Sequence, residues 1–168
     1  MSISLLEAFK GCKQPLSITR WILEGNKHVE QGETIYVDIP SGIDDNEIIT
    51  IKNKGNKLNS STKGDIEIKI NIINNTAFER NGIDLIFKKS ITLKESLCGF
   101  VFDLPYIDGR EFRINNELGN IIPPDFHKTI SKFGMRRDSS IGDLIIIFDV
   151  IYPKKISLEQ LSKLSEIL

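Results

Sequence analysis

Gly64-Asp65-Ile66-Glu67-Ile68 opens a run in which isoleucines alternate with polar residues as far as Ile72. This period of two places the isoleucines on one face of a β-strand and the polar residues on the other. The same opening returns as Gly142-Asp143-Leu144-Ile145-Ile146, at the start of a second apolar run. The sequence therefore predicts a strand and a repeat of that strand.

Two further pairs of segments match in the same order along the chain, which indicates an internal duplication. The matching pairs are Ser4–Gly11 with Thr92–Gly99 and Thr50–Gly55 with Thr129–Gly134. In the first pair a hydroxyl residue, a leucine and a glutamate keep the same spacing, and a glycine closes the segment. Three matches in one order predict a duplicated β domain, with the junction between residues 74 and 80.

Alternation and turn residues predict the remaining elements. Strands are expected around residues 16–18, 34–39, 83–93 and 144–152, and segments 4–10 and 92–98 should each form one helical turn with a hydroxyl N-cap. Asp108-Gly109 predicts a two-residue hairpin turn. The expected fold is mainly β: two tandem β-barrel or sandwich-like subdomains with short helical turns, over residues 1–75 and 76–153, and then a C-terminal helix over residues 154–168.

The C-terminal segment carries a helix signal of its own. Pro153 ends the last strand, and Ser157 with Gln160 forms a capping box. Four leucines then share one face: Leu158, Leu161, Leu164 and Leu168. A helix this short is marginal alone in water, so the leucines must pack either on their own domain or on a second copy of the chain.

Composition excludes several classes of protein. The net charge of −1 does not favour a general nucleic-acid binder. The longest fully apolar run, Leu144–Phe148, is too short to cross a bilayer, and Met1–Lys10 lacks the layout of a signal peptide. Cys12 and Cys98 are widely separated and form no CxxC, so we expect reduced thiols in a cytoplasmic protein, without a metal or cofactor.

The sequence does not favour an enzyme. His28 and His127, the only histidines, lie in different halves, and no nucleotide-binding or nucleophile motif occurs. Asp44, Asp45 and Glu47 are expected to form a solvated turn. Trp21 is the only tryptophan, so a carbohydrate site built on exposed aromatics is a weaker alternative than core packing of this side chain. A structural scaffold without a binding groove is a further alternative.

Several motifs resemble the C-terminal region of DnaJ-type co-chaperones. Phe78-Glu79-Arg80-Asn81-Gly82-Ile83-Asp84-Leu85 is similar to the F-x-R-x-G-x-D-L junction of that family, its most specific element here. The other similar segments are Ser4–Gly11, Val37–Ile43, Leu93–Gly99, Leu104–Arg110, Gly142–Leu144 and Tyr152-Pro153. They occur in the family's order and cover nearly the whole chain.

The resemblance implies a function. In the family, an apolar groove on the first subdomain holds an extended segment of an unfolded polypeptide, the C-terminal helix makes a homodimer, and the client passes to a DnaK-type heat-shock chaperone. Mapped by motif, the peptide-binding residues are Leu16, Ile18 and Ile68. The dimerisation residues are Leu158, Leu161, Leu164 and Leu168. The alternative is that the first three are ordinary core residues.

The chain also departs from the family pattern. It contains no CxxCxGxG insert, which resembles the zinc-free class, and it has neither a His-Pro-Asp triplet nor a Gly/Phe-rich linker. Lysines beside the family's groove attract the acidic tail of the partner chaperone. Here only Lys13 and Arg20 flank the segment, and Pro15 lies within it.

Overall fold

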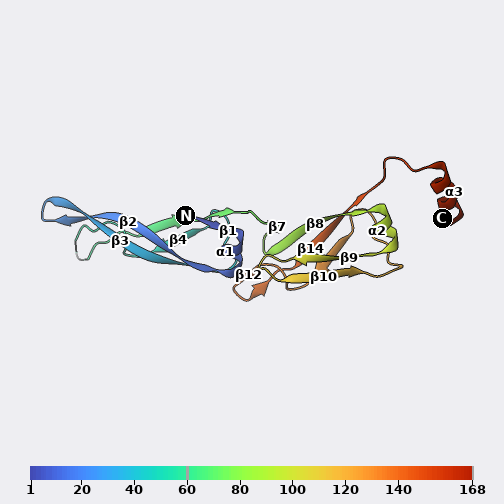
Figure 1. Ribbon diagram of the computed structural model, residues 1–168. Helices are drawn as coiled ribbons and strands as arrows, with labels where there is room; N and C mark the ends of the chain where they lie inside the picture. Colours follow the sequence, from blue (N-terminus) through green and yellow to red (C-terminus); the bar gives the residue numbers. More distant parts are fainter. Residues whose placement is uncertain (60, 168) are drawn as a thin grey trace.

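The computed structural model describes residues 1–59 and 61–167. Two β-rich halves lie end to end, and a short helix stands at the far end of the chain (Figure 1). We call residues 1–75 the N-terminal half and residues 76–153 the C-terminal half. The prediction of a mainly β fold with a C-terminal helix is confirmed.

The elements of both halves follow one another in a repeated order. The N-terminal half contains β1 (Ser2–Ser4), α1 (Leu5–Lys10), β2 (Cys12–Glu24), β3 (Lys27–Ile39), β4 (Ile48–Ile51), β5 (Ile66–Lys69) and β6 (Asn71–Ile73). The C-terminal half contains β7 (Phe78–Asn81), β8 (Asp84–Thr92), α2 (Leu93–Cys98), β9 (Phe100–Pro105), β10 (Glu111–Asn116), β11 (His127–Ile130), β12 (Arg136–Arg137), β13 (Ser140–Ile141) and β14 (Leu144–Ile151), and α3 (Leu158–Ile167) follows it.

The two halves pair their strands in the same way, which confirms the internal repeat. β1 runs parallel to β6 as β8 runs parallel to β14, and each half has one long hairpin, β2–β3 or β9–β10. The register also agrees, because Ile3 lies opposite Ile72 in one half. In the other half Ile91 lies opposite Val150.

The sheets are open rather than closed into barrels. One sheet has four strands in the order β11-β14-β8-β7, and the other pairings in the described part of the chain are two-stranded. Buried apolar residues of both halves nevertheless form one hydrophobic cluster, which contains Ile43 and Ile70 as well as Leu85 and Leu144. The open hairpins therefore extend from a core that is continuous along the molecule.

The two short helices begin with the predicted hydroxyl N-caps, and in each the N-cap belongs to a capping box. In α1 the Glu7 amide donates to Ser4 Oγ at 3.2 Å, and the Ser4 amide donates to the Glu7 carboxylate at 2.7 Å. Thr92 and Glu95 repeat both distances at the start of α2. These hydrogen bonds lower the pKa of Glu7 and of Glu95, with the bond from the backbone amide as the largest cause.

The β9–β10 hairpin differs from the predicted two-residue turn. The Gly109 amide donates to the Tyr106 carbonyl at 3.0 Å, and the Tyr106 amide donates to the Arg110 carbonyl at 2.7 Å. Residues 107–109 therefore form a three-residue loop, with Gly109 at a φ of 93°. The Asp108 carboxylate accepts from the Arg110 amide at 3.1 Å, which stabilises the longer loop.

Candidate functional site

The inner face of the β2–β3 hairpin changes from apolar to charged along its length. Leu16 lies opposite Ile35, and the next pair on the same face is Ile18 with Glu33. Ile35 is buried, whereas Leu16 and Ile18 are half-buried. The apolar strip therefore ends at Ile18.

The predicted peptide-binding residues are brought together only in part. Ile68 is 6% exposed and belongs to the hydrophobic cluster, and Leu16 packs against that cluster. Ile18 lies one step further along β2, outside the cluster of the described residues. Leu16 and Ile18 thus retain partly accessible side chains beside a buried Ile68.

A group of ion pairs closes the distal end of the apolar strip. Arg20, although only 8% exposed, lies 2.6 Å from the Glu33 carboxylate and donates to the Lys54 carbonyl at 3.2 Å. The Lys54 ammonium donates to Glu33 at 2.5 Å, and this bond is the largest cause of the lowered pKa of Glu33. Arg20 is therefore neutralised within the protein and is not a free cation beside the strip.

The outer edge of β2 is used by the protein at one end only. The Lys57 amide donates to the Trp21 carbonyl at 3.0 Å, and the Leu23 amide donates to the Lys57 carbonyl at 2.9 Å. Backbone groups of a strand alternate in direction, so Ser17 and Thr19 direct theirs to the same edge as Trp21. Within residues 1–59 and 61–167 the β2–β3 sheet has no third strand, which leaves that edge open beside Leu16 and Ile18.

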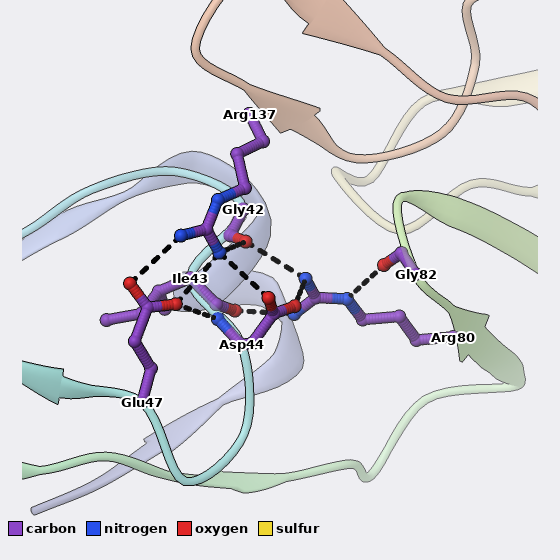
Figure 2. Close-up of polar contacts among 7 residues, drawn as sticks. All are labelled: Gly42, Ile43, Asp44, Glu47, Arg80, Gly82 and Arg137. Atoms are coloured by element: carbon purple, nitrogen blue, oxygen red, sulfur yellow. Dashed lines mark hydrogen bonds and ion pairs between the residues drawn. The ribbon is translucent and has the colours of Figure 1, made fainter.

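Two arginines of the C-terminal half hold the turn that precedes β4 (Figure 2). Arg80, on β7, donates to the Asp44 carboxylate at 2.6 Å and to the Ile43 carbonyl at 2.5 Å. Arg137, on β12, donates to the Glu47 carboxylate at 2.8 and 3.0 Å and to Asp44 at 2.9 Å. Asp44 and Asp45 are exposed, as expected of a solvated turn, but Asp44 and Glu47 also link the two halves through these ion pairs.

The ionisation of this cluster follows from its contacts. The bond from Arg137 is the largest cause of the lowered pKa of Glu47, and the same bond raises the pKa of Arg137. Burial lowers the pKa of Arg80, which the negative charge of Asp44 opposes. Sequence reasoning missed this link, although Arg80 lies in the most specific motif and an arginine there signals a carboxylate partner.

The C-terminal helix leaves its leucines uncovered. The α3 capping box forms as predicted, because the Gln160 amide donates to Ser157 Oγ at 3.2 Å. Leu158 is 86% exposed and Leu161 is 51% exposed, and no described residue of α3 is buried. Leu168 lies outside the described residues.

An apolar cleft lies between α3 and the end of the C-terminal half. It has a volume of about 600 Å³ and is lined by Leu93, Leu97, Ile151, Ile156 and Leu164, among others. α2 and β14 form one wall, and α3 contributes the other. The helix therefore stands next to an apolar surface that it does not fill.

Other chemistry is sparse in the described part of the chain. Trp21 is half-buried, and its ring stacks on that of His28 near the tip of the hairpin, with 4.6 Å between the ring centres. The expectation that Trp21 packs in the core was therefore wrong.

Cys12 and Cys98 are free thiols. No group of three or more His, Cys, Asp and Glu side chains among residues 1–59 and 61–167 converges as a metal site requires. None of the helices described there is long and apolar enough to span a membrane.

The pairing of the halves and the motif at their junction agree with one known family. The family model described as "DnaJ C terminal domain" matches residues 1–153. The chain belongs to the DnaJ C-terminal domain family. Only α3 and the segment before it lie beyond the part that matches the DnaJ model.

Relatives of known name carry the same family designation. "Chaperone protein dnaJ 2" of Arabidopsis thaliana is 32% identical over 148 residues, which cover 86% of this chain and 35% of that protein. "DnaJ protein homolog 1" of Drosophila melanogaster is 29% identical over 169 residues, which cover 99% of this chain and 50% of that protein. The chain therefore spans between about a third and a half of the length of these DnaJ relatives.

Proposed function

We propose that the N-terminal half binds extended apolar segments of unfolded polypeptides along the open edge of β2, as the client-binding part of a DnaJ-type co-chaperone. The observation that carries this proposal is the open backbone edge at Ser17 and Thr19 beside the half-buried side chains of Leu16 and Ile18. An added strand would gain main-chain hydrogen bonds, which tolerate any sequence, and the apolar strip would favour apolar side chains.

The length of the binding edge is limited at both ends. Pro15 offers no amide hydrogen to an added strand, and the Lys57 loop already occupies the edge at Trp21. The free stretch between them is short, so binding is expected to be weak and tolerant of sequence. Such binding suits a protein that must release its clients.

We propose further that α3 joins two copies of the chain. A helix of 10 residues without buried side chains is marginal in water, and only Leu164 of its described leucines lines the apolar cleft of about 600 Å³ beside it. Leu158, Leu161 and Leu164 of a second copy would cover apolar surface there, and the predicted fourth residue of the stripe, Leu168, lies outside the described residues. Two weak grooves on one dimer would bind a client more tightly through effective concentration.

The partner of this system is inferred from the chaperone names of the relatives. We propose that clients are delivered in the cytoplasm to a DnaK-type chaperone. Arg20, which flanks the groove at its distal end, is paired with Glu33. Binding of an acidic chaperone tail there is therefore not part of the proposal. No catalytic step is proposed.

Aggregation of a heat-denatured client protein tests the groove. We expect the parent chain to suppress light scattering, and the Leu16→Ser, Ile18→Ser variant to lose most of that suppression. The matched control is Tyr36→Ser, Ile48→Ser, which alters two exposed apolar residues on the outer faces of β3 and β4. Equal suppression by both variants, with both folded by circular dichroism, would favour the scaffold alternative.

Light scattering coupled to gel filtration tests the dimer. Removal of residues 157–168 should leave both halves folded and reduce the mass to that of one chain. Leu161→Lys should have the same effect, whereas Glu166→Lys, which changes an exposed polar residue of the same helix, should remain dimeric. If the mass per particle shows the same number of chains with and without α3, the proposal that this helix joins two copies is contradicted.

A further inference from the structure

A cavity of about 370 Å³ lies where the two halves meet, and residues of both halves line it. Phe9, Lys10 and Ser41 come from the N-terminal half. The C-terminal half contributes mainly the β9–β10 loop and the segment before β12, with three cations: Arg110, Lys132 and Arg136. The cavity therefore exists only when the two halves are docked.

The rim of this junction cavity is positively charged. Four of its lining residues are cationic, and none is Asp or Glu. Lys10, Lys132 and Arg136 form no ion pair with any described residue, and all three are exposed. A chain with a net charge of −1 has thus gathered unneutralised positive charge at one cavity.

The neighbouring cluster of Arg80, Arg137, Asp44 and Glu47 contains the carboxylate partners that Lys132 and Arg136 of the cavity lack. Arg137, adjacent in sequence to Arg136, is matched by Asp44 and Glu47 within 3.0 Å. In the described part of the chain neither Arg136 nor Lys132 forms an ion pair, although the Asp143 carboxylate accepts from the Lys132 backbone amide at 2.8 Å. The protein neutralises the arginines that link its halves and leaves Lys10, Lys132 and Arg136 of the cavity available for an external anion.

The floor of the cavity is aromatic. Tyr106 is buried, meets the ring of Phe9 edge-on at 5.9 Å and meets the ring of Phe133 at 6.1 Å. The Tyr106 hydroxyl is already used, because it donates to the Phe133 carbonyl at 2.7 Å. The Arg110 guanidinium lies 5.4 Å from the centre of the Tyr106 ring and pairs with the Asp108 carboxylate at 2.8 Å, so it is held in place and neutralised within the protein.

We propose that the junction cavity binds an acidic peptide segment that carries one large apolar side chain. The apolar side chain would contact Phe9, Tyr106 and Phe133, and the flanking carboxylates would pair with Lys10, Lys132 and Arg136. This site goes beyond the groove on β2, since it lies on other residues and selects for charge. The cavity of about 370 Å³ lies at the small end of the range of ligand pockets, about 300–1,000 Å³, so it has room for one large side chain but not for a longer segment.

The site is coupled to the docking of the two halves. A Cβ atom at Gly42 would collide with the Arg136 carbonyl oxygen, so the backbones are in close contact beside the cavity. Arg137 holds the same contact through Glu47. Loss of that ion pair should therefore weaken acidic-peptide binding without touching any lining residue.

Fluorescence anisotropy provides the test, with the full chain and a fluorescein-labelled peptide of sequence Asp-Glu-Asp-Phe-Asp-Glu. We expect saturable binding at low salt that weakens steeply as salt increases, because the contacts are exposed ion pairs. Peptides with Asn and Gln in place of the acids, or with Gly in place of Phe, should bind at least about tenfold more weakly.

Two matched charge reversals locate the site. Lys132→Glu, Arg136→Glu should weaken binding about tenfold or more, whereas Lys27→Glu, Lys52→Glu, which alters the net charge equally at exposed lysines outside the cavity, should remain within about twofold of the parent. Equal losses in both variants, or no binding by the parent, would overturn the proposal. Leu16→Ser, Ile18→Ser should bind this peptide normally, so failure of the groove and failure of this site are distinguishable.

Discussion

The two hairpins of the repeat differ in length, and the difference decides which half has an open apolar strip. β2 and β3 have 13 residues each, whereas β9 and β10 have six each. Leu16 and Leu104 are both the fifth residue of their strand, yet Leu104 is completely buried and Leu16 is half-buried. The loop of the shorter β9–β10 hairpin, which contains Tyr106, covers the core, whereas the longer β2–β3 hairpin extends beyond the core.

The turns before β4 and β11 are a second pair of equivalent segments with the same backbone but different side chains, one charged and one apolar. Asn46 and Asp125 have φ angles of 64° and 59° at the same place in the repeat. Glu47 follows in one half and pairs with Arg137, whereas Phe126 follows in the other and lines an open cavity of about 480 Å³. The backbone is repeated, and the side chains are set by what lies against each copy.

The largest expected effect is a difference between the two equivalent leucines. Leu104→Ala should lower the free energy of unfolding by about 3–4 kcal/mol, because a completely buried side chain leaves a cavity. Leu16→Ala should cost about 1 kcal/mol, since its side chain is already partly in water. Urea denaturation measures both values. Equal losses of unfolding free energy would show that Leu16 is an ordinary core residue and would contradict the proposal that it lines a peptide-binding groove.

The link between the halves should have the next largest effect. Arg80→Ala removes the donor to the Ile43 carbonyl and leaves Asp44 with Arg137 as its remaining arginine partner, which should cost about 2 kcal/mol in unfolding free energy. The control is Arg113→Ala, an exposed arginine of β10, which should cost less than about 0.5 kcal/mol. Thermal denaturation followed by circular dichroism distinguishes the two. An Arg80 effect no larger than the control would mean that the halves are not held by this cluster.

The two capping boxes should respond alike. Ser4→Ala and Thr92→Ala each remove a side-chain acceptor from a helix start with the same geometry, so each should cost about 1 kcal/mol. Denaturation of the two variants under one condition gives the comparison. A loss confined to one half would show that the repeat is conserved in shape but not in its energetics.

The smallest expected effect is the pH dependence contributed by Glu47. Its pKa is lowered in the folded protein, so its contribution is fully present above the ordinary value of 4.5 and is lost as the pH falls through the lowered pKa. The slope of unfolding free energy against pH below 4.5 should be shallower in Glu47→Gln than in the parent. Phe126, its counterpart, cannot contribute, so Phe126→Leu should keep the parental slope.

Local patterns in the sequence predicted much of this comparison. The repeat was predicted from matching segments. The hydroxyl N-caps of α1 and α2 and the capping box of α3 depend on residues within a few positions of each other, and each was predicted from spacing. The pairing of Glu47 with Arg137 joins residues 90 apart, and no local pattern contains it. The same limit explains the loop at Asp108, where burial of Tyr106 favours three residues over the local preference for two.

Only those features of the candidate site that follow from strand alternation could be predicted from the sequence. Alternation placed Leu16 and Ile18 on one face, but the burial of Ile68 depends on how β4 and β5 pack on the cluster. The open edge of β2 was not predicted by position either, because it depends on where the Lys57 loop ends its contact with Trp21. Such features are set by segments far apart in the chain.

Amide hydrogen exchange measured by NMR, with and without an extended apolar peptide, tests the central claim most directly. The peptide should slow exchange at Ser17 and Thr19, whose amides face the open edge of β2, and should leave the Leu16 and Ile18 amides, already bonded to β3, unchanged. Ser17→Pro removes one amide donor from the open edge, just as the natural Pro15 offers none there, and should therefore weaken binding of the peptide. Unchanged exchange at Ser17 and Thr19 in a complex that forms would contradict strand addition at this edge.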